Sequence, residues 1–167
     1  MGKVFEYSVV VREHNLDTLG HLNNASYLQL FEEARWDFSN KGGFGLDWVL
    51  SNQRSPVVVK AEMSFRKEVL NREVLLIESE FVGFKNSLIG SFKQKMIKEN
   101  RKIASILNID VGFMDLKERK LLNFPINNVT KFFLSPRDLM IILFIQMAYL
   151  HLCLKRYSMK YVVKSMV

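Results

Sequence analysis

The residues best suited to chemistry lie together near the start of the chain, in the stretch DTLGHLNN from Asp17 to Asn24. Apolar residues with helical spacing follow at once, so this stretch precedes the N-terminus of a helix. The first N–H groups of a helix have no partner within it and carry partial positive charge, which suits them to hold an oxyanion. A turn at Gly20 would fold the Asp17 carboxylate back over that helix end. A carboxylate that faces the N–H groups of a helix start is sufficient for acyl transfer. The carboxylate acts either as the nucleophile or as the general base for a water.

The residue types alone are also compatible with a purely structural role for this stretch. Asp, Thr, Gly and Asn are ordinary turn and cap residues, and this holds for Asp17, Asn23 and Asn24 as well as for the loop histidine His21. The adjacent acids 32 and 33 inside the helix are weaker catalytic candidates, because they flank its apolar face beside a basic residue at position 35. Position in the fold, rather than residue type, must therefore decide which carboxylate is catalytic.

Composition also narrows the class of protein. The chain has 167 residues, of which 49% are hydrophobic, and this suits one domain with a substantial core. Its net charge of +7 favours anionic partners, but the basic residues are scattered, which disfavours nucleic acid. A single cysteine, Cys153, excludes an internal disulfide and a cysteine metal site, and three dispersed histidines disfavour a histidine cluster, so we predict no metal. This cysteine usage and the lack of a signal-peptide pattern predict a cytoplasmic protein.

The elements that must position the polar stretch are a strand over residues 3–12 before it and a helix over residues 24–40 after it. Four further strand-like segments follow. They span residues 55–69, 73–84, 86–100 and 102–115. Tight links between them predict an antiparallel meander, and the whole order predicts an α+β protein in which a curved antiparallel sheet of five or six strands wraps one long central helix. A sheet that covers one helix leaves an exposed edge, so we expect a dimer.

Residues 1–125 are predicted to form this domain, and residues 126–167 a helical C-terminal extension. Within the extension, residues 139–154 are nearly all apolar. The segment is shorter than the roughly 20 residues that a membrane span needs. A buried or interface helix is therefore favoured over two alternatives, a segment that lies on or enters a membrane and an atypical or poorly packed extension.

The segment VREHNLDTLGHLNNASYLQLFEEAR resembles the opening of the hotdog-fold acyl thioesterases, both the 4-hydroxybenzoyl-CoA thioesterase-like branch and the acyl-ACP thioesterases. The family pattern is an Asp, a short stretch with a Gly or polar residue, His-Val-Asn-Asn, a Tyr after two residues, and Phe-Glu-x-Ala-Arg. The matching residues are Asp17, Gly20, His21, Leu22, Asn23, Asn24, Tyr27, Phe31, Glu32, Ala34 and Arg35. The resemblance extends over residues 4–124.

The resemblance implies a hotdog fold whose active sites lie at a homodimer interface, in dimers that stack into tetramers in many members. It implies that Asp17 is the catalytic carboxylate and that the N–H of Asn24 polarises the thioester carbonyl, with His21 and Asn23 shaping the site. The residues implied to bind substrate are Tyr27, Leu28 and Phe31 for the acyl group, and Arg66 and Lys67 for the pantetheine or phosphate end of coenzyme A.

The predicted function is hydrolysis of an acyl-CoA thioester to free acid and CoA, with no metal or organic cofactor. Two alternatives stay open, an acyl-ACP thioesterase and a non-catalytic acyl-binding hotdog module. A hydratase on the same fold is disfavoured, because it uses a histidine in a proline-rich loop and none of the three prolines lies near His14 or His21. The chain departs from the family pattern at Asn15, where an Asp or Ser is common, and at Glu68, where a Pro is common. These departures bear on the substrate more than on the reaction, and the sequence does not predict acyl chain length.

Overall fold

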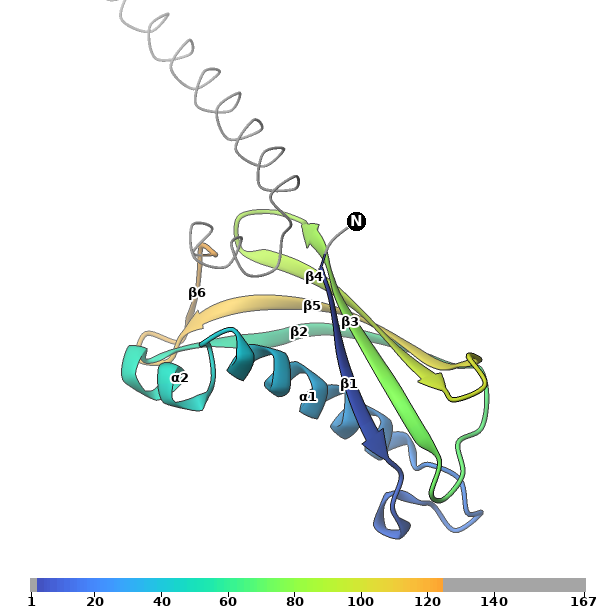
Figure 1. Cartoon of the computed structure of the whole chain (residues 1–167). Coiled ribbons are helices and arrows are strands. Elements are labelled where there is room, and N and C mark those ends of the chain that lie inside the picture. Colours follow the sequence, from blue (N-terminus) through green and yellow to red (C-terminus); the bar gives the residue numbers. More distant parts are fainter. Residues whose placement is uncertain (1–2, 125–167) are drawn as a thin grey trace, which may run out of the picture.

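A long helix, α1 (Asn24–Lys41), lies beneath a six-stranded antiparallel sheet that curves over it (Figure 1). The computed structural model describes residues 3–124. The other elements are, in chain order, β1 (Val4–Val10), the short 3₁₀ helix η1 (Glu13–Asn15), α2 (Leu46–Asn52), β2 (Arg54–Phe65), β3 (Val74–Phe84), β4 (Ile89–Lys98), β5 (Ile103–Asp115) and β6 (Lys120–Leu122). The predicted central helix and curved sheet are confirmed. The predicted helical extension, residues 126–167, lies outside the described residues.

The bounds of helix α1, Asn24–Lys41, agree closely with the predicted residues 24–40. The side chain of Asn23 accepts a hydrogen bond from the N–H of Ala25 at 2.9 Å, which caps the first turn. The helical spacing predicts an apolar stripe of Tyr27, Leu28, Phe31, Ala34 and Phe38, and all of these except Leu28 are buried on the face toward the sheet. Leu28 is 42% exposed, because one residue further along a helix turns the side chain by about 100° away from that stripe.

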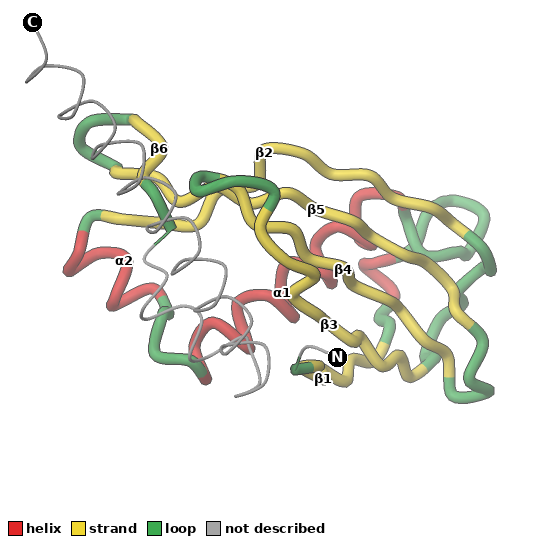
Figure 2. Tube along the Cα trace, turned by 90° about the horizontal axis from the view of Figure 1, so that it is seen from above, coloured by secondary structure: helices red, strands yellow, loops and turns green. Residues whose placement is uncertain are grey.

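The strands are arranged in the order β1-β3-β4-β5-β2, as Figure 2 shows from above. Short links join β3, β4 and β5 into the predicted meander, but the prediction that β2 belongs to it was wrong. Strand β2 pairs with β5 at the opposite edge from β1, and Val58, for example, is opposite Val111. The reason is that β2 ends at Phe65 rather than continuing to residue 69, so residues 66–73 form a link long enough to cross the end of the sheet.

One face of the sheet packs against α1, and the other faces solvent. Along β5, Leu107, Ile109, Val111 and Phe113 are buried on the inner side, while Asn108 and Asp110 between them are less buried. The outer side carries opposite charges on neighbouring strands. Glu78 is opposite Lys95, and their side chains approach to 3.5 Å. This pattern of one apolar and one polar face is typical of antiparallel sheets and fixes which side of each strand meets the helix.

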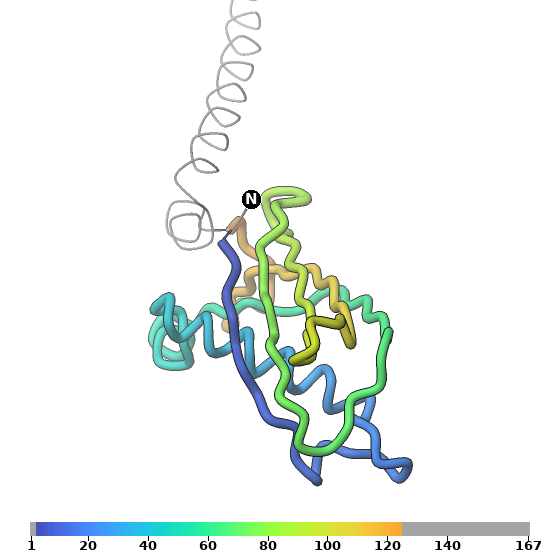
Figure 3. The backbone as a smooth tube through the Cα atoms, turned by 45° about the vertical axis from the view of Figure 1, so that its right-hand side comes forward, coloured from blue at the N-terminus to red at the C-terminus, as the bar shows by residue number. Residues whose placement is uncertain are grey.

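Three short elements, η1, α2 and β6, were not predicted, and α2 and β6 both lie at one end of the sheet (Figure 2). Figure 3 shows α2 at the far end of α1 from the loop that precedes α1. Its Trp48 packs against Phe44 and Phe113, with ring centroids 5.2 and 5.9 Å apart. Strand β6 pairs with the end of β5, and its Leu121 fills the space beside Gly112, where a Cβ would come within 2.6 Å of the leucine. Together they close that end of the sheet.

No helix within residues 3–124 combines the length and apolar character needed to cross a membrane. The apolar segment 139–154 lies outside the described residues, so its predicted place in a core, an interface or a membrane stays a prediction.

Candidate active site

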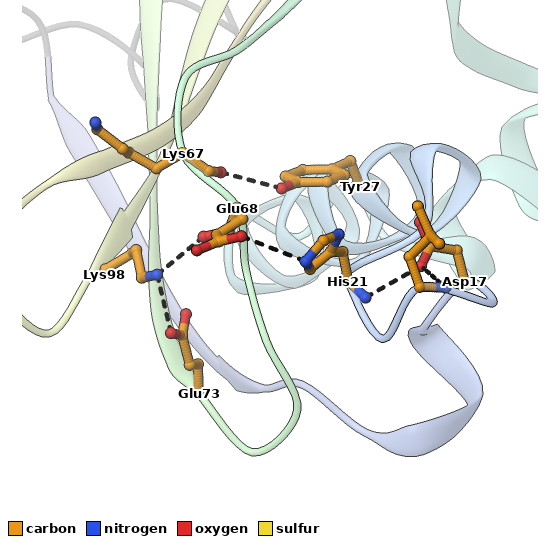
Figure 4. Close-up of polar contacts among 8 residues, drawn as sticks. Asp17, His21, Tyr27, Lys67, Glu68, Glu73 and Lys98 are labelled. Atoms are coloured by element: carbon orange, nitrogen blue, oxygen red, sulfur yellow. Dashed lines mark hydrogen bonds and ion pairs between the residues drawn. The ribbon is translucent and has the colours of Figure 1, made fainter.

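The carboxylate of Asp17 is held in place by its own loop (Figure 4). Its Oδ1 accepts hydrogen bonds from the N–H groups of Leu19 at 2.8 Å and His21 at 3.1 Å, and its N–H donates to the carbonyl of His21 at 2.8 Å. The predicted turn is present, since Gly20 has φ +81, a conformation that glycine adopts without strain. Within residues 3–124, Oδ2 has no hydrogen-bond partner. The half-buried carboxylate is therefore oriented through one oxygen, with the other left for a ligand or a water.

The start of α1 presents backbone N–H groups beside this loop. The N–H of Asn23 donates to the carbonyl of Asn15 at 2.9 Å, and the N–H of Leu22 to that of Val69 at 2.8 Å, so the approach to the helix is fixed from both sides. The N–H of Asn24, the first helical residue, has no acceptor among the described residues. Asn23 itself is occupied as the cap, which makes its side chain a structural element of the helix start.

The segment after β2 joins this loop through its backbone and through His21. His21 and Leu70 form an isolated antiparallel bridge, and Nε2 of His21 lies 3.3 Å from Oε2 of Glu68. The Nζ of Lys98 donates to the carbonyl of Glu68 at 2.9 Å and pairs with Oε1 of Glu73, also at 2.9 Å (Figure 4). Sequence reasoning missed Glu73 and Lys98, because they meet only where residues 66–73 cross the end of the sheet.

Tyr27 connects α1 to the end of β2. Its ring meets that of Phe65 edge-on, with centroids 5.0 Å apart, and its hydroxyl donates to the carbonyl of Lys67 at 3.5 Å. Burial raises the pKa of Tyr27, and the negative charge of Glu73 adds to this, so the hydroxyl stays a neutral donor at physiological pH. The side chains of Arg66 and Lys67 are exposed, and the ammonium of Lys67 points away from Tyr27 (Figure 4).

An apolar cavity of about 370 Å³ lies beside the second half of α1. Its walls come from α1, α2, the first half of β2 and the inner faces of β4 and β5, and they include Phe44, Trp48, Phe113 and Phe124. The predicted acyl-binding residues Tyr27, Leu28 and Phe31 are not among its lining residues. The first wall residue on α1, Glu32, is eight residues after Asn24, which is about 12 Å along the helix. Within one chain, the cavity and the Asp17 loop are therefore separate.

One charged side chain on the cavity wall, Arg35, is tied into the core. Its Nη1 donates to Oε1 of Gln94 at 2.7 Å, and Nε2 of this fully buried glutamine donates to Oγ of Ser79 at 2.8 Å and to the carbonyl of Phe31 at 3.0 Å. Burial lowers the pKa of Arg35, while the charge of Glu32 raises it. In the described part of the chain Arg35 forms no ion pair with an acid, although the sequence placed acids beside it.

The chain matches the family model of the Thioesterase-like superfamily over residues 11–134, a range that contains the Asp17 loop, α1 and the whole sheet except β1. The chain belongs to this superfamily. It is therefore a thioester hydrolase with the hotdog fold, as the resemblance predicted.

Relatives of this thioesterase agree in sequence and in fold. The long-chain acyl-CoA thioesterase FadM of Escherichia coli strain K12 is 32% identical over 117 residues, which cover 68% of this chain and 86% of the relative. The crystal structure of the probable thioesterase YbaW from Escherichia coli is 26% identical, with a TM-score of 0.69, over 77% of this chain and 98% of that one. The Staphylococcus aureus protein SAV2348, solved in complex with CoA, matches 78% of this thioesterase and 82% of its own chain with a TM-score of 0.71, and at 15% identity it shows the fold alone.

Proposed function

We propose that this thioesterase hydrolyses acyl-CoA to a free acid and CoA, with Asp17 as the catalytic carboxylate and the N–H of Asn24 as the oxyanion donor. The observation that carries the proposal is the pairing of two groups at the start of α1. Asp17 is oriented by backbone N–H groups through Oδ1 alone, and the N–H of Asn24 has no acceptor among the described residues. The name of the relative FadM supports acyl-CoA as the substrate class.

In the reaction, the thioester oxygen lies at the N–H of Asn24, where the positive end of α1 stabilises the charge that develops as the carbonyl carbon is attacked. With Asp17 as general base, it takes a proton from the attacking water, and the tetrahedral intermediate expels the CoA thiolate. With Asp17 as nucleophile, the thiolate leaves first and water then cleaves the acyl–aspartyl anhydride. Both routes give the free acid and CoA, and neither requires a metal or an organic cofactor. His21 and Asn23 hold the loop and the helix start in position.

Two copies of the chain would complete the site. Strand β2 is an edge strand whose apolar residues are exposed: Val58 by 48%, Val59 by 49% and Phe65 by 51%. Two-fold pairing of two such edges is antiparallel, so the start of one β2 lies beside the end of the other. The start of β2 forms part of the cavity wall, and its end contacts Tyr27 next to the catalytic loop. We therefore place the acyl group in the cavity of one subunit and the attacking Asp17 in the other.

The remaining predicted roles fit this dimer. Tyr27 and the exposed Leu28 would line the passage from the helix start to the second subunit, with Phe31 supporting Tyr27 from the core. Arg66 and Lys67 follow the end of β2 and are exposed, so their charges are available to the phosphates of CoA or of a phosphopantetheine carrier. Tetramer formation and a cytoplasmic location stay predictions.

The test is thiol release from a panel of acyl-CoA thioesters and from an acyl-carrier protein. Asp17→Asn should lower kcat on the preferred substrate by about 10²–10⁴-fold. Asp37→Asn is the matched control, because Asp37 is an acid on α1 whose ion pair within residues 3–124 is with the exposed Lys41. Undiminished hydrolysis by Asp17→Asn would exclude the mechanism. Absence of hydrolysis of every thioester would favour the acyl-binding module.

A further inference from the structure

The cavity combines an apolar wall with one guanidinium. Aromatic rings dominate the lining, and several of them are in contact with one another: Trp48 with Phe113, and Phe113 with Phe124 at 6.0 Å between centroids. A plain hydrocarbon chain would match that surface. Arg35, which lies on the same wall, would not be needed for it.

Arg35 has more hydrogen-bonding capacity than its surroundings use. A guanidinium carries five N–H donors, and only Nη1 has a hydrogen-bond acceptor within residues 3–124, Oε1 of Gln94. Burial lowers the pKa of Arg35, which reflects the cost of holding the cation away from water. No acid among the described residues forms an ion pair with it. Donors in such a position favour a ligand that supplies an acceptor oxygen.

The position of Arg35 indicates where on the acyl group that oxygen belongs. Arg35 is eleven residues after Asn24, about 17 Å along α1 from the oxyanion site of its own subunit. In the proposed dimer the thioester lies against the catalytic loop of the other subunit, and the acyl chain enters the cavity between β2 and α1. Arg35 then meets the acyl chain beyond the thioester, inside the cavity.

We infer that the cavity selects acyl groups with an acceptor oxygen at the end remote from the thioester, and that Arg35 binds this oxygen. The inference rests on the proposed acyl-CoA hydrolysis and makes it more specific. A carboxylate, a hydroxyl and an oxo group share the required chemistry. Glu32 lies on the same wall, so its negative charge opposes a carboxylate and leaves a hydroxyl unaffected.

The experiment compares kcat/KM for dodecanoyl-CoA with that for its ω-hydroxy and ω-carboxy analogues, which have the same carbon number. The wild-type protein should have a kcat/KM about tenfold higher for an ω-oxygenated substrate than for plain dodecanoyl-CoA. A factor of this size corresponds to the free energy of one hydrogen bond to a charged group. Arg35→Met should reduce that ratio to about one, and Arg35→Lys should retain part of it, because it keeps the charge without the planar fork. Comparing the hydroxy with the carboxy substrate shows whether the cavity prefers a hydroxyl or a carboxylate.

Glu32→Gln provides a test that does not depend on the Gln94 contact. Glu32 is exposed, so the substitution should not affect folding, and it should raise the ratio of ω-carboxy to plain substrate several-fold. A purely structural role for Arg35 would make Arg35→Met lower kcat/KM equally for all three substrates, and unchanged Glu32→Gln ratios would show that the ω-end of the acyl group does not reach this wall. Either result, or a wild-type preference for plain dodecanoyl-CoA, would overturn the inference alone. Failure of the proposed function differs, since it would appear as no hydrolysis of any acyl-CoA or as insensitivity to Asp17→Asn.

Discussion

Asn24 occupies the position in α1 where a backbone N–H can be removed with least damage to the helix. Proline is favoured at the first helical residue, because that N–H has no intrahelical acceptor. The preceding residue, Asn23, has φ −66 and ψ 145, the extended conformation that a following proline requires. We predict that Asn24→Pro lowers kcat by about 10²–10³-fold, the usual loss for one oxyanion donor, with the melting temperature unchanged or raised. Thiol release and thermal unfolding measure the two quantities.

The matched control is Asn24→Ala, which keeps the N–H and removes only an exposed side chain. It should retain near wild-type kcat, since the proposal assigns the role to the backbone. Equal activity of the proline and alanine variants would show that the oxyanion is held elsewhere. An equal loss of kcat in the proline and alanine variants would instead assign the role to the side-chain carboxamide of Asn24.

At this scale the sequence predicts local features well and long-range neighbours poorly. The turn at Gly20 and the cap at Asn23 depend on residues within a few positions, and both are present. The contacts of His21 with Glu68, and of Lys98 with Glu73, join residues from separate strands and links. No spacing in the sequence brings those residues together, because their contact depends on how residues 66–73 cross the sheet.

At the scale of elements, the buried network around Gln94 holds α1 against the sheet. Gln94 on β4 links Arg35 and the carbonyl of Phe31 on α1 to Ser79 on β3. We predict that Gln94→Leu lowers the free energy of unfolding by about 2–4 kcal/mol, because it removes the acceptor of the half-buried Arg35 cation and a partner of the buried Ser79 hydroxyl. Urea unfolding measures this change. The exposed Gln29→Leu on α1 is the control and should change it by less than about 0.5 kcal/mol. Similar values for the two variants would mean that the network contributes no stability.

The order of the long elements β1, α1, β2, β3, β4 and β5 was predicted correctly, but the pairing of β2 was not. The links between β3, β4 and β5 are short, and short links require consecutive strands to pair side by side and antiparallel. The β2–β3 link is predicted from the sequence to be tight, because the strand is predicted to continue to residue 69 and a turn to follow it directly. In the structure the N–H groups of Arg66 and Lys67 both donate to the carbonyl of Ala104 on β5, and the carbonyl of Val69 accepts from the N–H of Leu22 before α1, so this segment does not turn directly into β3. The alternation of apolar and polar residues predicts a strand, but it does not predict which other strand pairs with it.

At the scale of the whole molecule, the position and the lining of the cavity were the features that the sequence predicted least well. Its walls come from α1, α2, three strands and Phe124, so its position depends on the packing of elements that the sequence places far apart. The predicted acyl-binding residues were chosen from the first turns of α1, next to the catalytic loop. The cavity instead lies along the second half of the helix, and this separation is the reason for proposing a site shared between two subunits.

A shared site makes a prediction that a site within one subunit does not. Asp17→Asn removes the carboxylate but leaves the cavity, whereas Ser39→Trp fills the cavity from α1 but leaves the carboxylate. Each homodimer should be nearly inactive. A heterodimer, isolated by two different affinity tags after co-expression, contains one complete site, formed by Asp17 of the Ser39→Trp subunit and the cavity of the Asp17→Asn subunit. Thiol release should therefore recover to about half of the wild-type rate. If each site lay within one chain, both chains of the heterodimer would be defective, and no activity would return.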